Sequence, residues 1–172
     1  MSIAAIAAIT VNAETKKFDS FFGFTFGEKL KITENVKKSP FASPEAWERC
    51  YDVVPEKQFE RFNKVTVRTS ANDEIFEVKM TCNLGKDQND AATELNRKVR
   101  AILEKKFGEP SNRRMEECTW LFDGGKRSIT YVGHTLATWP DFSITATASD
   151  KRSEFKKAFT EKELKSSDAD LL

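Results

Sequence analysis

Apolar and polar residues alternate along several segments of the chain, and this period of two is typical of β-strands that bury one face. Residues 63–69 alternate in this way, and so do residues 142–149. The longest alternation occupies residues 76–84, where one face carries Phe76, Val78, Met80, Cys82 and Leu84. Because turn-forming residues at 71–73 separate the first segment from the longest, these two are predicted to form an antiparallel hairpin.

Two adjacent glycines predict a second hairpin. Residues 117–122 and 126–132 are alternating segments on either side of a Gly-Gly pair at 124–125. Glycine adopts the positive φ angles that a two-residue hairpin turn requires. With the glycine pair as the turn, the apolar face carries two opposed pairs, Trp120 with Ile129 and Cys118 with Tyr131.

The period changes to 3.6 in residues 88–107, which predicts a long amphipathic helix. Its apolar face carries Leu95, Val99, Ile102, Leu103 and Phe107. Gly108 suits the left-handed conformation that ends many helices, and Pro110 prevents the helix from resuming.

The N-terminal half of the chain predicts shorter elements. Phenylalanines at period two predict a strand in residues 22–26. Ser43 can serve as an N-cap, with Pro44 at the first helical position, so we predict a short helix through residues 47–50. A brief strand is predicted at 51–54, directly before Pro55.

The order of these elements predicts the fold class. Because each well-patterned strand has one apolar face, we expect an α+β domain, a mostly antiparallel sheet of about five to seven strands. The long helix (about 88–107) and a C-terminal helix (about 151–165) are expected to pack on that face, with a flexible tail at 166–172. A length of 172 residues, 39% of them hydrophobic, fits a single domain at residues 14–165.

Residues 1–13 carry no charged side chain, and their apolar run ends in Val-Asn-Ala, the pattern of a signal peptide and its cleavage site. They predict export to the periplasm or out of the cell. The signal would be truncated at its start, since no Lys or Arg precedes the run. The alternative is a cytoplasmic protein whose N-terminal helix docks on the domain. The run is about half the ~20 residues that cross a bilayer, so no stable membrane anchor is expected.

Charge and histidine content narrow the function classes. The chain has 28 Lys and Arg against 27 Asp and Glu, a formal net charge of +1, which argues against a strongly basic nucleic-acid binder. It has one histidine and no C-x-x-C motif, which argues against most histidine chemistry and zinc sites. The oxygen donors of residues 87–90 fit a helix cap better than a calcium loop. We therefore predict no cofactor, no metal ion and no catalytic residue.

The three cysteines leave two interpretations open. Cys82 and Cys118 both lie on predicted apolar faces, which would allow a cross-sheet disulfide if their strands were adjacent. The alternative is two buried thiols that pack as small apolar residues. Cys118 is also near His134 in the second hairpin, but the predicted register places their side chains on opposite faces, which argues against a catalytic dyad.

Two features are candidates for contact with a partner. Trp139 and Asp141 fall in a predicted loop between strands, where an exposed tryptophan would be an anchor for another protein. The alternative is that Trp139 folds under the edge of the sheet. Residues 18–26 contain five phenylalanines. Since each buried Phe contributes about 1.5–3 kcal/mol, most should lie in the core, and one or two remain for a partner.

Two short motifs carry a resemblance to known proteins. The sequences Phe-Thr-Phe-Gly-Glu at 24–28 and Lys-Phe-Gly-Glu-Pro at 106–110 resemble small exported α+β domains of bacteria. In shape, the predicted domain is similar to outer-membrane assembly lipoproteins and to β-lactamase-inhibitor-like modules. The chain lacks the lipobox cysteine of the lipoproteins after its apolar run, and the resemblance assigns a role to no residue.

Together these features predict an exported, non-catalytic domain that binds another protein through loops or a sheet edge. Two alternatives stay open. One is a small-ligand carrier that uses the concave face of the sheet together with Trp139. The other is a hydrolase with two acidic catalytic residues, for which the spacing nominates no pair.

Overall fold

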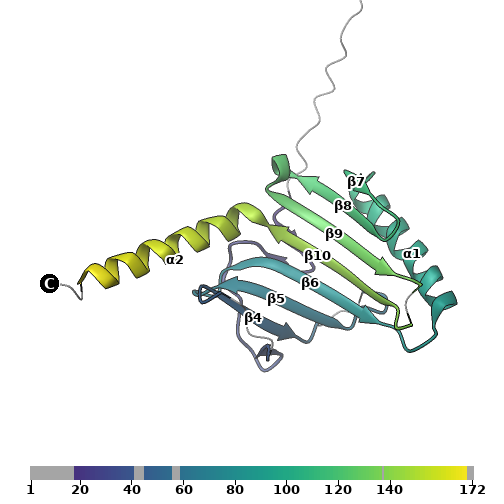
Figure 1. Ribbon diagram of the computed structural model, residues 1–172, viewed down its shortest axis with the longest axis horizontal. Helices are drawn as coiled ribbons and strands as arrows, with labels where there is room; N and C mark the ends of the chain where they lie inside the picture. The colour runs from purple at the N-terminus through teal and green to yellow at the C-terminus, as the bar shows by residue number, and fades with distance from the viewer. Residues whose placement is uncertain (1–17, 41–44, 56–58, 137, 170–172) are drawn as a thin grey trace, which may run out of the picture.

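An eight-stranded antiparallel sheet forms the body of the protein in the computed structural model, which describes residues 18–40, 45–55, 59–136 and 138–169 (Figure 1). The strand order is β3-β4-β5-β6-β10-β9-β8-β7. The bounds are β3 (Val36–Lys38), β4 (Glu48–Val53), β5 (Lys64–Ser70), β6 (Ile75–Asn83), β7 (Asn112–Arg113), β8 (Glu117–Phe122), β9 (Arg127–His134) and β10 (Asp141–Ala148). The predicted α+β class is confirmed. The sheet has more strands than expected because edge strands β3 and β7, with three and two residues, are too short to show an alternation.

The two predicted hairpins are present, and β10 lies between them. It pairs with β6 on one side and β9 on the other. The predicted register of β8 and β9 is confirmed, with Trp120 opposite Ile129. Gly124 and Gly125 have φ angles of 64° and 87°, the positive values that the turn requires. On the apolar face, fully buried side chains include Val65, Val67, Val78, Met80, Ile129 and Ile144.

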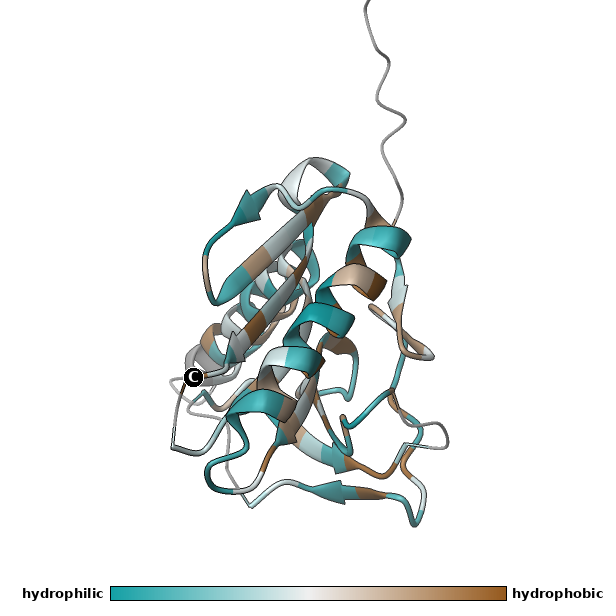
Figure 2. Ribbon diagram, turned by 90° about the vertical axis from the view of Figure 1, so that its right-hand side faces the viewer, coloured by the Kyte–Doolittle hydropathy of each residue, from teal (hydrophilic) through white to brown (hydrophobic). Residues whose placement is uncertain are grey.

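The long helix α1 (Asn89–Phe107) packs on the apolar face of the sheet and crosses in front of it in Figure 2. Its buried stripe consists of Ala92, Leu95, Val99 and Leu103. The helix ends at Gly108, as predicted, and the Gly108 N–H donates to the carbonyl of Glu104. Its φ of 83° and ψ of −165° lie in an extended region that is essentially restricted to glycine, and not in the left-handed helical conformation that was expected. The indole Nε1 of Trp120, on β8, donates to the carbonyl of Gly108 at 2.8 Å. This bond fixes the end of α1 to the sheet.

A β-bulge moves Phe76 out of the face predicted for it. Arg68 pairs with Glu77, but the next residue of β5, Thr69, pairs with Ile75. Phe76 is therefore the extra residue, and Ile75 joins the main core in its place. Phe76 packs instead in a second cluster with Trp47 and Phe155. Alternation alone had grouped Phe76 with Val78 and Met80.

The predicted short helix through residues 47–50 is wrong. Strand β4 begins at Glu48 and pairs with β5 over its whole length, from Glu48 opposite Ser70 to Val53 opposite Val65. Pairing with β5 satisfies the backbone there, and it overrides the local helix signal. The predicted cap residues Ser43 and Pro44 lie outside the described residues.

The phenylalanine-rich segment forms a small hairpin instead of one strand. Strands β1 (Ser20–Phe21) and β2 (Phe24–Thr25) pair with each other, apart from the main sheet. Phe22 and Gly23 are the two turn residues, with φ angles of 53° and 86°. Among the phenylalanines of this segment, Phe18, Phe21 and Phe26 are buried, and Phe22 and Phe24 are only partly buried.

The C-terminal helix α2 (Ser149–Ala169) extends beyond the sheet (Figure 1). Its first part packs on the second cluster through Phe155 and, more loosely, Phe159. Residues 160–166 are exposed. The helix runs to Ala169, so the predicted tail starts inside it, and residues 170–172 lie outside the described part, as does the predicted signal segment 1–13.

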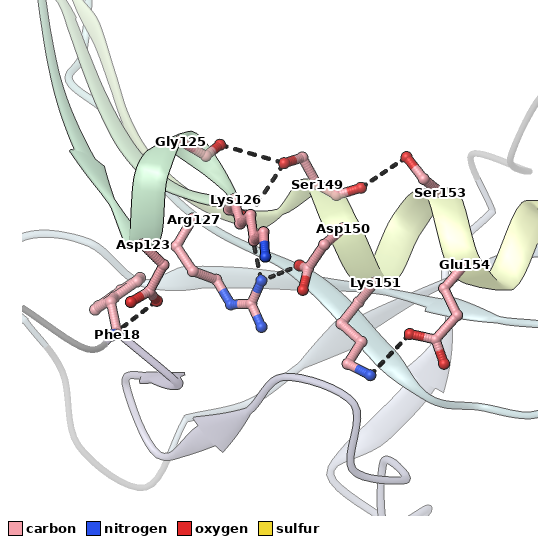
Figure 3. Close-up of polar contacts among 10 residues, drawn as sticks. All are labelled: Phe18, Asp123, Gly125, Lys126, Arg127, Ser149, Asp150, Lys151, Ser153 and Glu154. Atoms are coloured by element: carbon pink, nitrogen blue, oxygen red, sulfur yellow. Dashed lines mark hydrogen bonds and ion pairs between the residues drawn. The ribbon is translucent and has the colours of Figure 1, made fainter. Parts of the chain in front are cut away.

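Polar contacts hold the N-terminal end of α2 against the β8–β9 turn (Figure 3). The hydroxyl of Ser149 donates to the carbonyl of Lys126 at 3.1 Å, and the Ser149 N–H donates to the same carbonyl at 2.9 Å. Arg127 forms an ion pair with Asp150. These contacts fix the direction in which α2 leaves the sheet.

Candidate partner-binding surface

Three connections meet at the end of the sheet where β9 stops and β10 starts. The β9–β10 loop spans residues 135–140, of which residue 137 is not described. The N–H of Gly133 donates to the carbonyl of Glu116, which brings the start of β8 beside the end of β9 at 2.9 Å. The segment between β6 and α1 donates backbone hydrogen bonds to the β9–β10 loop. We call the six residues at this end the loop-end surface: Met115, Glu116, His134, Leu136, Trp139 and Asp141.

Large apolar side chains of the loop-end surface face solvent. The exposed fractions are 80% for Met115, 78% for Leu136 and 58% for Trp139. The alternative in which Trp139 folds under the sheet edge is therefore wrong. Large exposed apolar side chains on connections at one end of a sheet are candidates for contact with another protein.

Backbone hydrogen bonds hold Trp139 in place from both sides. The N–H of Asp87 donates to the carbonyl of Thr138 at 3.1 Å, and the N–H of Leu84 donates to the carbonyl of Pro140 at 2.9 Å. Pro140 itself is buried. A tryptophan on a loop fixed in this way loses little conformational entropy when a partner binds.

Asp141 and Glu116 flank the single histidine of the chain. His134 and Asp141 face each other across β9 and β10, and the imidazole Nδ1 lies 3.0 Å from Asp141 Oδ1. The imidazole Nε2 is 4.0 Å from Glu116 Oε2. All three side chains are about half exposed, so the surface combines an apolar part with an acidic part.

A chain of partly buried polar contacts supports the loop-end surface from α1. Arg100 Nη2 donates to the carbonyl of Met115, and Arg100 Nε donates to Asn96 Oδ1 at 3.1 Å. The hydroxyl of Tyr131 donates to the same Asn96 oxygen at 2.9 Å. Burial raises the pKa of Tyr131 well above its ordinary value, so this hydroxyl keeps its proton. The segment that carries Met115 is thus tied to the helix and to the core.

The structure separates Cys82 from Cys118. They lie on β6 and β8, with β10 and β9 between them. Neighbouring strands are about 4.8 Å apart, so the three steps from β6 to β8 separate the two strands by roughly 14 Å. A disulfide requires a Cα–Cα distance of only about 4.4–6.8 Å. Both are free and buried, as is Cys50. Burial raises the pKa of the Cys82 and Cys50 thiols.

The register keeps Cys118 away from His134. Cys118 is fully buried opposite Tyr131 on the apolar face, and His134 lies on the other face of β9. The thiol therefore lies across the sheet from the imidazole. Among the described residues, no three His, Cys, Asp or Glu side chains form a group that could hold a metal ion.

The sequence identified part of this surface. The sequence predicts Trp139 and Asp141 in a loop. Trp139 lies in the loop, but Asp141 is the first residue of β10, paired with His134. Met115 and Leu136 were not among the predicted contacts. A signal was present: the register set by the glycine pair places residue 115 opposite His134.

The helix predicted at 88–107 is present, but Gln88, which precedes it, makes no side-chain hydrogen bond to cap it. Residues 87–90 are therefore not the predicted cap.

Comparisons with protein families, with curated proteins and with solved structures found no match for this chain. No helix among the described residues is both long enough and apolar enough to span a membrane.

Proposed function

We propose that the protein is an exported, non-catalytic module that binds another protein through the loop-end surface. The observation that supports this is the exposure of Met115, Leu136 and Trp139 on connections held in place by backbone hydrogen bonds. In protein interfaces, tryptophan is enriched among the residues that contribute most to affinity. The partner would offer an apolar recess for Trp139 and positively charged groups toward Asp141 and Glu116.

The test compares variants of the protein in its natural host. Trp139→Ala and Asp141→Asn are each purified from the host beside the wild type, and co-purified proteins are quantified by mass spectrometry. A protein that is specifically reduced by both substitutions supports the proposal. We expect Trp139→Ala to weaken binding by about 2 kcal/mol or more.

The matched control is Leu121→Ala, which removes an exposed apolar side chain from β8, away from the loops. It should leave the same partner bound. A set of co-purified proteins that is the same for wild type, Trp139→Ala and Asp141→Asn contradicts the proposal.

Export is tested on the same material. Mass spectrometry of the mature chain should show a new N-terminus near Glu14 in a periplasmic or secreted fraction. A chain with an intact Met1 in the cytosol would contradict export, but it would leave the binding proposal unaffected.

The ligand-carrier alternative predicted from the sequence requires Trp139 to contact the ligand. Trp139 does not line the cavity beside Phe22 or the one that adjoins it. The hydrolase alternative requires a carboxyl group with a raised pKa. The residue spacing nominates no such group. The exposed apolar side chains of the loop-end surface favour the binding module instead.

A further inference from the structure

A cavity of about 550 Å³ lies between the β1–β2 hairpin and the edge of the sheet. Its apolar wall is formed by Phe22, Phe24, Val36, Val53 and Val54. This volume is within the range of sites that hold small molecules, roughly 300–1,000 Å³. None of its lining residues belongs to the loop-end surface.

Phe22 occupies an unusual position for a phenylalanine. Phe21 pairs with Phe24, so Phe22 and Gly23 form a two-residue turn in which both φ angles are positive. Asn, Asp or Gly normally fills the first of these positions, since a bulky side chain is strained there. The ring of Phe22 is only partly buried, so core packing alone does not account for it. Strained residues of this kind gather at ligand sites.

A second cavity of about 400 Å³ adjoins the first and adds positive charge. The two share Gly23, Phe24, Thr33 and Val36 in their walls, so they form one cleft. Lys29 and Lys31 line the second part together with Glu28, and two lysines against one glutamate leave one positive charge. Within the described residues, neither lysine has an ion-pair partner. The cleft is thus apolar at one end and cationic at the other.

We propose that this cleft binds a small amphipathic carboxylate. The apolar body lies against Phe22, Phe24 and Val36, and the carboxylate lies near Lys29 and Lys31. An apolar wall alone would accept any apolar molecule, and the two ammonium groups of Lys29 and Lys31 select for an anion. This assignment is independent of the protein-binding proposal, because it uses different residues.

Decanoate is the probe for this site, below its micelle concentration, with decanol as the uncharged counterpart. Isothermal titration calorimetry on the whole chain should show saturable binding of decanoate. Decanol should bind about tenfold more weakly, the effect of losing one charge-assisted contact. Absence of saturable decanoate binding overturns the proposal, and equal affinity for decanol overturns the role of the lysines.

Phe22→Asn separates a ligand contact from a structural role. Asn is favoured at this turn position, so the variant should unfold at the same temperature as the wild type or higher. Its affinity for decanoate should nevertheless fall about tenfold, because the ring is missing. A variant that loses stability and binds decanoate normally would show that Phe22 is a packing residue and overturn its place in the site.

The double variant Lys29→Gln with Lys31→Gln tests the cationic end. It should bind decanoate about tenfold more weakly and bind decanol as the wild type does. Lys157→Gln is the matched control, since Lys157 is an exposed lysine on α2. If the control weakens decanoate as much as the double variant, general charge explains the binding and the assigned site is wrong.

Discussion

His134 and Asp141 face each other across β9 and β10, with Nδ1 and Oδ1 at 3.0 Å, in a part of the sheet that is about half exposed. Exposed ion pairs contribute about 0–1 kcal/mol to stability. We therefore expect Asp141→Asn to change the free energy of unfolding by less than about 1 kcal/mol. Urea denaturation measures this change.

This small effect makes Asp141→Asn suitable for the binding experiment. A reduced yield of the partner with an unchanged unfolding curve would locate the defect in the surface. A much larger loss of stability would show that the pair holds the strand ends together, and its effect on binding would then be indirect.

Trp120 and Trp139 have opposite environments, and this gives a matched pair of substitutions. Trp120 is buried and donates to the carbonyl of Gly108 at 2.8 Å. Trp120→Phe removes this donor, so we expect a loss of about 1–3 kcal/mol in urea denaturation. Trp139→Phe should change stability by less than about 0.5 kcal/mol. Equal losses in the two variants would contradict the assignment of Trp120 to the α1–sheet junction.

Local patterns sufficed for those elements whose own residues determine their geometry. The glycine pair at 124–125 fixed the turn, and the turn fixed the register of β8 and β9. The apolar stripe from Leu95 to Leu103 together with Gly108 located α1. In these cases propensity, periodicity and packing favour the same structure.

The sequence failed where a distant pairing decides the outcome. The bulge at Phe76 depends on Thr69 meeting Ile75, and alternation cannot show an inserted residue. Strand β4 exists because β5 lies beside it, against a local helix signal. The cavity beside Phe22 joins separate segments of the chain, at 22–24, 33–36 and 53–55, so no single motif marks it.

The second cluster packs α2 against the sheet. We expect this part of the protein to open locally while the main core stays folded. Phe155→Ala empties the centre of a small cluster with Trp47 and Phe76. We expect less than the ~3–5 kcal/mol of a Phe→Ala change in a full core, and a local opening of α2. Amide hydrogen exchange should speed up about tenfold in residues 150–160 and stay unchanged in α1.

The control for this experiment is Lys162→Ala, on the exposed part of α2. It should leave exchange in residues 150–160 as in the wild type. If Phe155→Ala speeds exchange in α1 to the same extent, then the second cluster is not an independent unit.

Because all three thiols are buried, we expect them to react slowly with thiol reagents in the folded protein. Since only the thiolate reacts, and burial raises the pKa of Cys50 and Cys82, native protein should react slowly with a disulfide reagent. In denaturant without reductant, all three thiols should react rapidly with the same reagent. A count of one thiol before reduction would show a disulfide, in conflict with the separation of β6 and β8.

Both tyrosines of the chain should titrate late. Burial raises the pKa of Tyr131, and for Tyr51 burial and the hydrogen bond that its hydroxyl donates to Asp73 act in the same direction. Above the ordinary pKa of about 10, the native state keeps protons that the unfolded state releases, so the free energy of unfolding falls as pH rises further. Absorbance of tyrosinate should stay low at pH values where the chain in urea is already ionised. Tyr51→Phe leaves Tyr131 as the single signal, and a native titration of this variant near pH 10 would contradict its burial against Asn96.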